Sequence, residues 1–385
     1  MARYCIVLVG FDRPASLKRL LKSVIHASYK GHTVDLLISI DGGPRSEHTL
    51  DRLGPVDWPH GNCVIRRMSE NMGLRRHVMH SGDVALDYDA IVMLEDDVIV
   101  GPAYFAYVNW AIQQYAQDDR IAGISLYAPN YNEMANLPFQ PTPSGSPVYT
   151  LQSAQSWGQC WSRMMWRDFR AWYDRQPNEL SCGSDMPERI HSWPASSWKK
   201  FAMRYLTDTR KTWIYPYVSH SSNWSELGTH NAQASQLFQV PLASTWAESA
   251  EVASTELVGY DIFFERIDMT ILGETELGNK EEVVCDLYGT RTEVVGPVCL
   301  ATVRVLPQSS VQEIGFNRKP HEANIEWLTP GHDARLYKID AGESVQLSDC
   351  RKSRAVGFYS QLEWRDSLRL AYEGLRQAIV RRLQR

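Results

Sequence analysis

The chain has 385 residues, of which 44% are hydrophobic and 22% are charged, so it is long enough for two globular domains of ordinary composition. Its formal net charge of -5 at pH 7 provides no overall basic field, which argues against a nucleic-acid-binding protein. The seven cysteines are scattered and form no Cys-x-x-Cys pair, so we expect a reducing cytoplasm, no zinc site and no disulfide framework. No apolar run reaches about 18 residues and a strand begins almost at once, so we expect neither a transmembrane helix nor a signal peptide.

The N-terminal part of the chain alternates between strands and helices. Residues 4–10 form a continuous apolar run that is typical of a buried parallel strand, and Pro14 stands near the start of the helix that follows. Further elements are a strand over 34–40, a short strand over 63–65, a helix over 74–86 and a strand over 90–94. This order predicts a doubly wound α/β sheet.

The middle of the chain continues with helices and strands around one long loop. The predicted elements are helices over 103–116, 160–174 and 195–208, and strands over 121–126 and 213–216. Residues 128–149 are rich in Pro, Asn and Ser and predict a loop. Loops of that length are usually functional or mobile.

The character of the sequence changes near residue 250. Residues 1–250 are expected to form the α/β domain, and the short β-prone segments of 251–355 predict a small antiparallel β domain. Residues 356–385 predict an amphipathic helix with a basic face. Such a helix either lies on an anionic membrane surface, which here would be the inner face of the cell membrane, or packs on its own domain. Both alternatives stay open.

The most informative stretch lies where the strand over 90–94 runs into Glu95, Asp96 and Asp97. A buried strand that ends in acids places negative charge at a sheet edge, where a crevice opens. Crowded carboxylates repel one another unless a cation neutralises them, and hard oxygen ligands suit Mg²⁺ or Mn²⁺. The stretch therefore predicts a metal site, with an acidic surface turn as the alternative.

Five stretches, taken in order, resemble motifs of one enzyme family. They are Ile6 to Pro14 with its Asp-Arg turn, Ile38 to Gly43, Arg75-Arg76-His77, Glu95-Asp96-Asp97 and Gln155-Ser156-Trp157-Gly158. On these motifs, the first 235 or so residues resemble glycosyltransferases of the GT-A fold. The likeness is to family-2-like bacterial sugar transferases and to the N-acetylglucosaminyltransferases that initiate complex N-glycans.

The resemblance implies a nucleotide-sugar donor, by preference UDP-linked, a divalent Mn²⁺ or Mg²⁺, and transfer to an acceptor hydroxyl of a glycan or lipid-linked glycan. Asp97 would hold the metal across the two phosphates, and Glu95 and Asp96 would accept hydrogen bonds from ribose or sugar hydroxyls. The other implied donor contacts are Asp41 to the base, Arg13 over the base or ribose, Arg75, Arg76 and His77 to the phosphates, and Trp157 and Gly158 beside the sugar.

Most of these residues also have a purely structural interpretation. Asp41 before Gly-Gly is a common turn former, and Trp157 is as compatible with core packing as with a sugar face. Arg75 and Arg76 are compatible with a solvated helix face, and His77 with a partly buried, satisfied histidine. Only the order and spacing of the motifs favour the functional interpretation.

The sequence departs from the family at the catalytic base. An inverting transferase needs a carboxylate that takes the acceptor's proton. Where the family carries two acids, this chain has Lys199-Lys200, and a protonated lysine accepts no proton. The candidates nearby are Asp185, Glu188 and Glu226, and the sequence does not choose among them.

Three functions follow from this pattern. The first is an inverting, metal-dependent glycosyltransferase of bacterial surface polysaccharide synthesis. The second is a sugar nucleotidyltransferase, which normally carries a glycine-rich loop after the first strand; Gly10 to Pro14 is not such a loop. The third is a non-catalytic carbohydrate-binding protein on the same fold, which only the two lysines favour.

Overall fold

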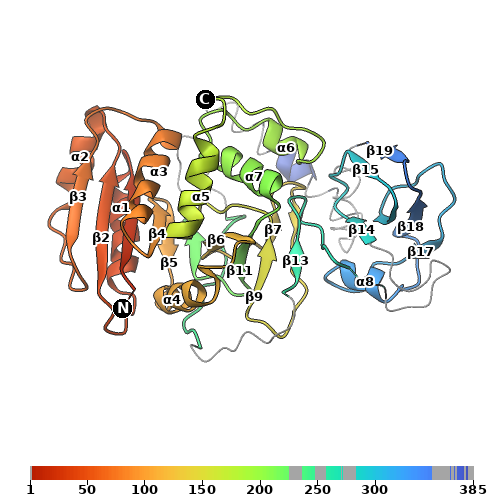
Figure 1. The fold of residues 1–385 in the computed structure, drawn as a ribbon, viewed down its shortest axis with the longest axis horizontal. Helices are drawn as coiled ribbons and strands as arrows, with labels where there is room; N and C mark the ends of the chain where they lie inside the picture. The colour runs from red at the N-terminus through yellow and green to blue at the C-terminus, as the bar shows by residue number, and fades with distance from the viewer. Residues whose placement is uncertain are drawn as a thin grey trace.

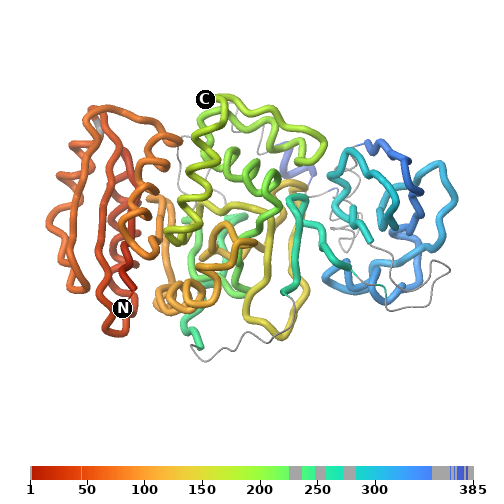
Figure 2. The backbone as a smooth tube through the Cα atoms, in the orientation of Figure 1, coloured from red at the N-terminus to blue at the C-terminus, as the bar shows by residue number. Residues whose placement is uncertain are grey.

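The computed structural model describes residues 2–224, 236–247, 257–269, 271 and 283–348 and, near the C-terminal end, residues 365, 368, 371–376 and 379. A nine-stranded mixed sheet with helices on its faces forms the larger part, and a small β-rich part lies at the other end of the long axis (Figure 1). The tube in Figure 2 follows the chain from the N-terminal strands to that small part. The predicted α/β sheet domain followed by a β-rich domain is confirmed.

The first half of the large sheet is parallel. Its strands are β1 (Tyr4–Gly10), β2 (Val34–Ile40), β3 (Cys63–Arg67) and β4 (Ala90–Glu95), in the spatial order β4-β1-β2-β3. The helices between them are α1 (Pro14–Ile25), α2 (Pro44–Leu53), α3 (Leu74–Gly82) and the short 3₁₀ helix η1 (Asp83–Leu86). Every residue of β1 is buried, because helices cover both faces of a parallel sheet. The carboxyl ends of these strands therefore meet at one edge.

The second half of the sheet mixes strand directions. Its strands are β6 (Ile121–Ser125), β9 (Val148–Leu151), β10 (Gln159–Ser162), β11 (Thr212–Pro216) and β13 (Gly259–Tyr260), in the order β13-β9-β11-β6-β10. Strand β10 pairs antiparallel with β4 and so joins the two halves. The helices are α4 (Tyr104–Tyr115), α5 (Arg163–Tyr173), α6 (Glu188–His191) and α7 (Trp198–Thr209).

One predicted helix is shorter in the structure. Residues 160–174 were expected to be helical, but Gln159–Ser162 form the buried strand β10 and the helix begins at Arg163. The Ser162 side chain accepts a hydrogen bond from the Met165 N–H and so caps the helix at this point. A short, fully buried apolar run does not distinguish strand from helix by its pattern alone.

The β-rich part contains the four-stranded sheet β14-β16-β18-β17 and one further strand pair. Its elements are β14 (Val283–Asp286), β15 (Glu293–Val295), β16 (Val298–Thr302), β17 (Gln312–Ile314), α8 (Glu322–Glu326), β18 (Ala334–Ile339) and β19 (Ser344–Gln346). Strands β14 and β16 run parallel, so the expectation of a purely antiparallel sheet is wrong for this pair. Strand β13 pairs with β9 of the large sheet, although it follows the boundary predicted near residue 250.

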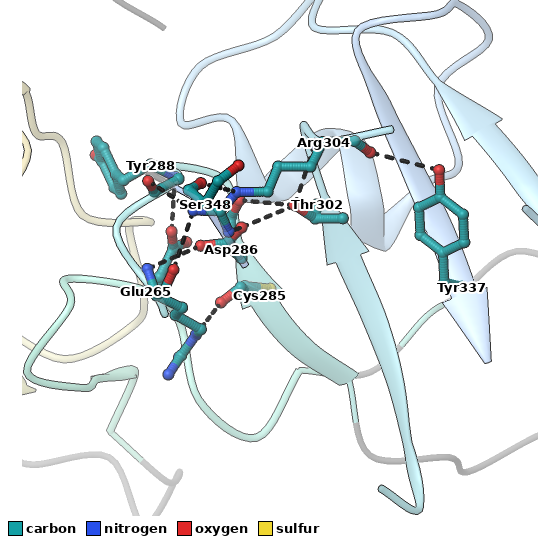
Figure 3. Close-up of polar contacts among 10 residues, drawn as sticks. Glu265, Cys285, Asp286, Tyr288, Thr302, Arg304, Tyr337 and Ser348 are labelled. Atoms are coloured by element: carbon teal, nitrogen blue, oxygen red, sulfur yellow. Dashed lines mark hydrogen bonds and ion pairs between the residues drawn. The ribbon is translucent and has the colours of Figure 1, made fainter. Parts of the chain in front are cut away.

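A buried ionic network stabilises the β-rich part (Figure 3). Arg304 forms an ion pair with Asp286, which also accepts a 2.8 Å hydrogen bond from Thr302, and Asp286 is 0% exposed. The Glu265 carboxylate accepts the Tyr288 N–H at 2.6 Å. This network consists of polar groups that satisfy one another inside the protein.

The predicted C-terminal helix stays a prediction. The described residues within it are helical, and Leu368, Tyr372, Leu375 and Ile379 expose more than half of their side-chain surface there. The rest of 356–385 lies outside the described residues. Among the helices that are described, none has the length and apolar character needed to cross a bilayer.

Candidate active site at the end of strand β4

The acid triplet lies at the carboxyl edge of the parallel sheet. Strand β4 is buried from Ala90 to Leu94 and ends at Glu95, which pairs in register with Val9 of β1. Asp96 and Asp97 form the turn into the short strand β5 (Val98–Val100). The strand and the turn after it thus carry three consecutive acids at this sheet edge.

In the described contacts, the guanidinium of Arg13 forms an ion pair with one acid of the triplet. Arg13, which precedes α1, forms an ion pair with Asp96, a residue that is 4% exposed. Burial, together with the charges of Asp97 and Asp96, raises the pKa of Glu95 to about 8. Burial also raises the pKa of Asp96 to about 7, although Arg13 opposes this shift. Protonation of these two acids is therefore favoured by burial.

Asp97 is oriented by a neighbouring strand. Strand β12 (Ser221–Asn223) pairs antiparallel with β5, and the Asn223 side-chain amide donates to the Asp97 carboxylate at 3.1 Å. The Trp224 N–H donates to the Asp97 carbonyl at 2.7 Å. Within the described residues, no three His, Cys, Asp or Glu side chains form a metal-binding group. Asp97 as a lone protein ligand still suits Mg²⁺ or Mn²⁺, which are commonly bound by one or two carboxylates with waters and substrate phosphates.

The structure places Asp41 at the end of β2, where it organises the backbone. Its carboxylate accepts the N–H groups of Gly42 and Met72 at 2.8 Å and of Gly73 at 3.0 Å. These bonds fix the chain just before α3. These hydrogen bonds agree with the interpretation of Asp41 as a residue that forms a turn. The contact of Asp41 with the base of a nucleotide stays a prediction.

The three basic residues of α3 point to different surroundings. Arg75 stacks over the Phe201 ring at 4.7 Å and donates to the Asn178 carbonyl at 2.9 Å. Arg76 is exposed and pairs weakly with Glu70 at 3.4 Å. His77 is buried against the Ser39 hydroxyl at 2.8 Å, and burial lowers its pKa to about 4. His77 is thus a neutral imidazole at neutral pH, and phosphate binding by these residues stays a prediction.

Trp157 and Gly158 lie in a tight turn. The Gln155 side-chain oxygen accepts the Trp157 N–H at 3.2 Å. Gly158 has φ +108°, and a Cβ there would lie 2.7 Å from the Ser221 hydroxyl, so glycine is required on both counts. The Trp157 ring packs at 5.0 Å against Tyr127, while its carbonyl accepts the Ser221 hydroxyl. The turn is therefore tied to β12, which also carries Asn223.

The predicted base candidates do not gather at the triplet in the described contacts. Asp185 is exposed and pairs with Arg204 at 2.9 Å. Glu188 is exposed at the first position of α6. Glu226 lies outside the described residues. Each assignment stays a prediction.

The two lysines of α7 have separate partners. The Lys200 ammonium donates to the carbonyls of His191 at 2.9 Å and Trp193 at 3.0 Å, and only 8% of the residue is exposed. Lys199 forms an ion pair with Glu133, a residue that sequence reasoning missed. Trp198, also missed, donates its indole N–H to Glu95 at 3.4 Å. No local motif marks Glu133; only its place in the long loop over 128–149 draws attention to it.

The sequence matches no protein-family model and no curated protein. Solved structures do resemble the fold. TarS 1–349 of S. aureus in complex with UDP-GlcNAc is 9% identical with a TM-score of 0.38, over 60% of this chain and 61% of that one. The mannosyltransferase PcManGT of Pyrobaculum calidifontis in complex with GDP-Man and Mn²⁺ is 9% identical with a TM-score of 0.34, over 56% and 57%. The chain thus spans less than two thirds of the length of each.

Proposed function

We propose that the chain is a metal-dependent glycosyltransferase that moves a sugar from a nucleotide-diphosphate sugar to an acceptor hydroxyl with inversion. The observation that carries the proposal is the acid triplet at the end of β4, where burial and the neighbouring carboxylates raise the pKa of Glu95 and Arg13 pairs with Asp96. Such a site gains stability when a cation enters. The resemblance of the sequence motifs supplies the reaction class.

The residues have distinct tasks in this proposal. Asp97 holds the metal, and Asn223 orients the Asp97 carboxylate through its 3.1 Å hydrogen bond. Glu95 and Asp96 accept hydrogen bonds from ribose or sugar hydroxyls, and Arg13 keeps Asp96 in place. When bound, Mn²⁺ or Mg²⁺ neutralises the diphosphate and makes it a better leaving group.

The acceptor belongs to the same proposal. We expect a glycan or lipid-linked glycan of bacterial surface polysaccharide synthesis, reached from the cytoplasmic face of the membrane. The resemblance to bacterial sugar transferases and the basic C-terminal segment support this expectation. Flotation with anionic and with neutral vesicles tests the membrane contact, because an electrostatic contact occurs with the anionic vesicles alone.

Asp97→Ala tests the metal assignment. In the wild type, a matching UDP- or GDP-sugar should raise the melting temperature by a few degrees only when Mn²⁺ is present, because ligands that bind the folded state stabilise it. The variant should lose this Mn²⁺-dependent shift and at least about 100-fold of donor turnover. The exposed acid Asp119 serves as the control, and Asp119→Asn should keep both.

The same assay separates the alternatives. A transferase releases free nucleotide diphosphate slowly when water replaces the acceptor, whereas a carbohydrate-binding protein releases none. A nucleotidyltransferase would instead form the nucleotide sugar from a nucleoside triphosphate and a sugar phosphate. A Mn²⁺-dependent shift that survives Asp97→Ala would show that the metal binds elsewhere.

A further inference from the structure

The structure places a carboxylate where the sequence shows only lysines. Lys199 stands at the second position of α7, and its ammonium forms an ion pair with Glu133. The Glu133 side chain is 19% exposed and that of Lys199 is 12% exposed, so the pair is largely shielded but still accessible. A negative oxygen is thereby brought from the distant loop to the start of α7.

Glu133 is held firmly for a loop residue. It lies between the paired strands β7 (Tyr131–Asn132) and β8 (Leu137–Pro138). The buried Asn132 side chain accepts the N–H groups of Met134 at 2.9 Å and Ala135 at 3.1 Å, and it donates to the Phe263 carbonyl at 3.2 Å. A residue fixed in this way is suited to a task that needs a defined position.

Two chains of contacts link Glu133 to the donor residues of the proposed function. Next to its partner Lys199, the Trp198 indole donates to Glu95 of the acid triplet. On the other side, burial and then the charge of Glu133 raise the pKa of Tyr127. The Tyr127 ring packs at 5.0 Å against Trp157, the residue predicted beside the donor sugar.

We propose that Glu133 is the general base of the transfer reaction and that Lys199 is the residue that positions it. This inference rests on the proposed function. The Glu133 carboxylate takes the proton of the acceptor hydroxyl while that oxygen forms its bond to the anomeric carbon. The bond from the anomeric carbon to the diphosphate breaks, and its electron pair leaves with the diphosphate oxygen. The protonated Glu133 then returns its proton to solvent.

The arrangement gives Lys199 a task in the reaction. Where the family carries two acids, this chain has a lysine that holds an acid from another segment. Lys199 also lies 5.4 Å over the Trp193 ring, which restricts the movement of its long side chain. Asp185, in contrast, is exposed and bound to Arg204.

Glu133→Gln is the direct test, because it keeps the shape and an oxygen for Lys199 but accepts no proton. The probe is hydrolysis of the UDP- or GDP-sugar that gives the Mn²⁺-dependent shift, with water as acceptor. We expect turnover to fall by about 10²–10⁴-fold. The Mn²⁺-dependent shift and the KM for the donor should stay within about twofold. The exposed Asp119→Asn is the control and should keep most of the turnover. A loss of the same size in Glu188→Gln or Asp185→Asn, with Glu133→Gln unaffected, would overturn the assignment to Glu133.

The outcomes separate this inference from the proposed function. If the wild type hydrolyses the donor and Glu133→Gln does so equally fast, Glu133 is not the base, although the protein is still a transferase. If the wild type neither binds nor hydrolyses any donor, both proposals fail. Should Glu133→Gln melt early, Glu133→Ala with added formate decides: formate must restore turnover if a carboxylate base is missing, and restoration does not occur if only packing was lost.

Discussion

Two groups of three acids can be compared within the described part of the chain, and they differ in how their charge is balanced. The first, at the end of β4, has one ion-paired guanidinium among its described contacts, that of Arg13. The second consists of Asp261, Glu265 and Asp286 in and beside the β-rich part. It has two guanidiniums, because Arg291 pairs with Asp261 and Arg304 with Asp286.

We interpret the second cluster as a structural site and the first as a site for a ligand. In the second cluster Arg304 also donates to the carbonyls of Gly289 at 2.9 Å and of Arg291 and Ser348 at 3.0 Å, so its donors are used within the protein (Figure 3). Burial raises the pKa of two acids in each cluster, Glu95 and Asp96 in the first and Glu265 and Asp286 in the second, so the clusters differ in their ion pairs and not in burial. A cation from outside would lower the raised pKa values of the first cluster. Buried charge is costly unless it is paired, so the first cluster lowers stability until a ligand binds.

The largest effect on stability is expected from Arg304→Met. This change leaves Asp286 buried without its cation and three carbonyls without a donor, so the free energy of unfolding should fall by about 3–5 kcal/mol. Urea unfolding measures the change. The control is Arg335→Met, because the pair of Arg335 with Glu313 is partly exposed and screened by water, so its loss should be much smaller. Equal losses in the two variants would contradict the contrast drawn between the clusters.

A smaller effect is expected from pH. In chelator, the folded protein holds the pKa of Glu95 near 8 and that of Asp96 near 7, above the values of 4.5 and 3.8 that free side chains have. As the pH rises, the unfolded chain loses these protons at a lower pH than the folded protein does. The free energy of unfolding is therefore greatest below the pKa values of the free side chains and falls as the pH rises towards 8. The fall is at most about 1.4 kcal/mol per pH unit for each group.

Saturating Mg²⁺ should flatten this dependence, because a bound cation keeps the first cluster ionised. The second cluster supplies the control. Burial also raises the pKa of Glu265, so this group too makes stability fall as the pH rises. Mg²⁺ should leave this part of the fall unchanged, and Glu265→Gln should remove it. Melting temperatures from pH 5 to pH 8, with and without Mg²⁺, distinguish the two contributions. An identical slope in both solutions would argue against a cation at the triplet.

The sequence predicts local and strongly patterned features well. Strands β1, β2 and β4 are continuous buried runs, and the acid triplet follows the last of them without a gap, so one short stretch contains both the strand and the charge. The predicted strand over 121–126 is confirmed as β6, apart from its last residue. In these cases neighbouring residues alone determine the structure.

Features that depend on distant partners escaped prediction. Glu133 meets Lys199 across 66 positions, and neither residue lies in a motif that points to the other. Likewise, β13 joins the large sheet because it pairs with β9, which lies far earlier in the chain. Pairing between distant segments is decided by tertiary packing, which a single sequence does not display.

The smallest expected effect comes from Trp198→Phe, and it tests the link between the triplet and α7. The change replaces the indole by a smaller aromatic ring and removes the N–H, whose 3.4 Å hydrogen bond to Glu95 lowers the pKa of that carboxyl. Without this donor the pKa of Glu95 rises further, so in chelator the variant should lose about 1 kcal/mol above pH 8, where Glu95 is ionised, and much less at pH 5. Trp161→Phe is the matched control, because it removes a 2.7 Å bond to the uncharged Gln159, and its loss should be the same at both pH values. A loss for Trp198→Phe that is equally independent of pH would mean that the indole only packs, and that α7 is coupled to the triplet by shape rather than by charge.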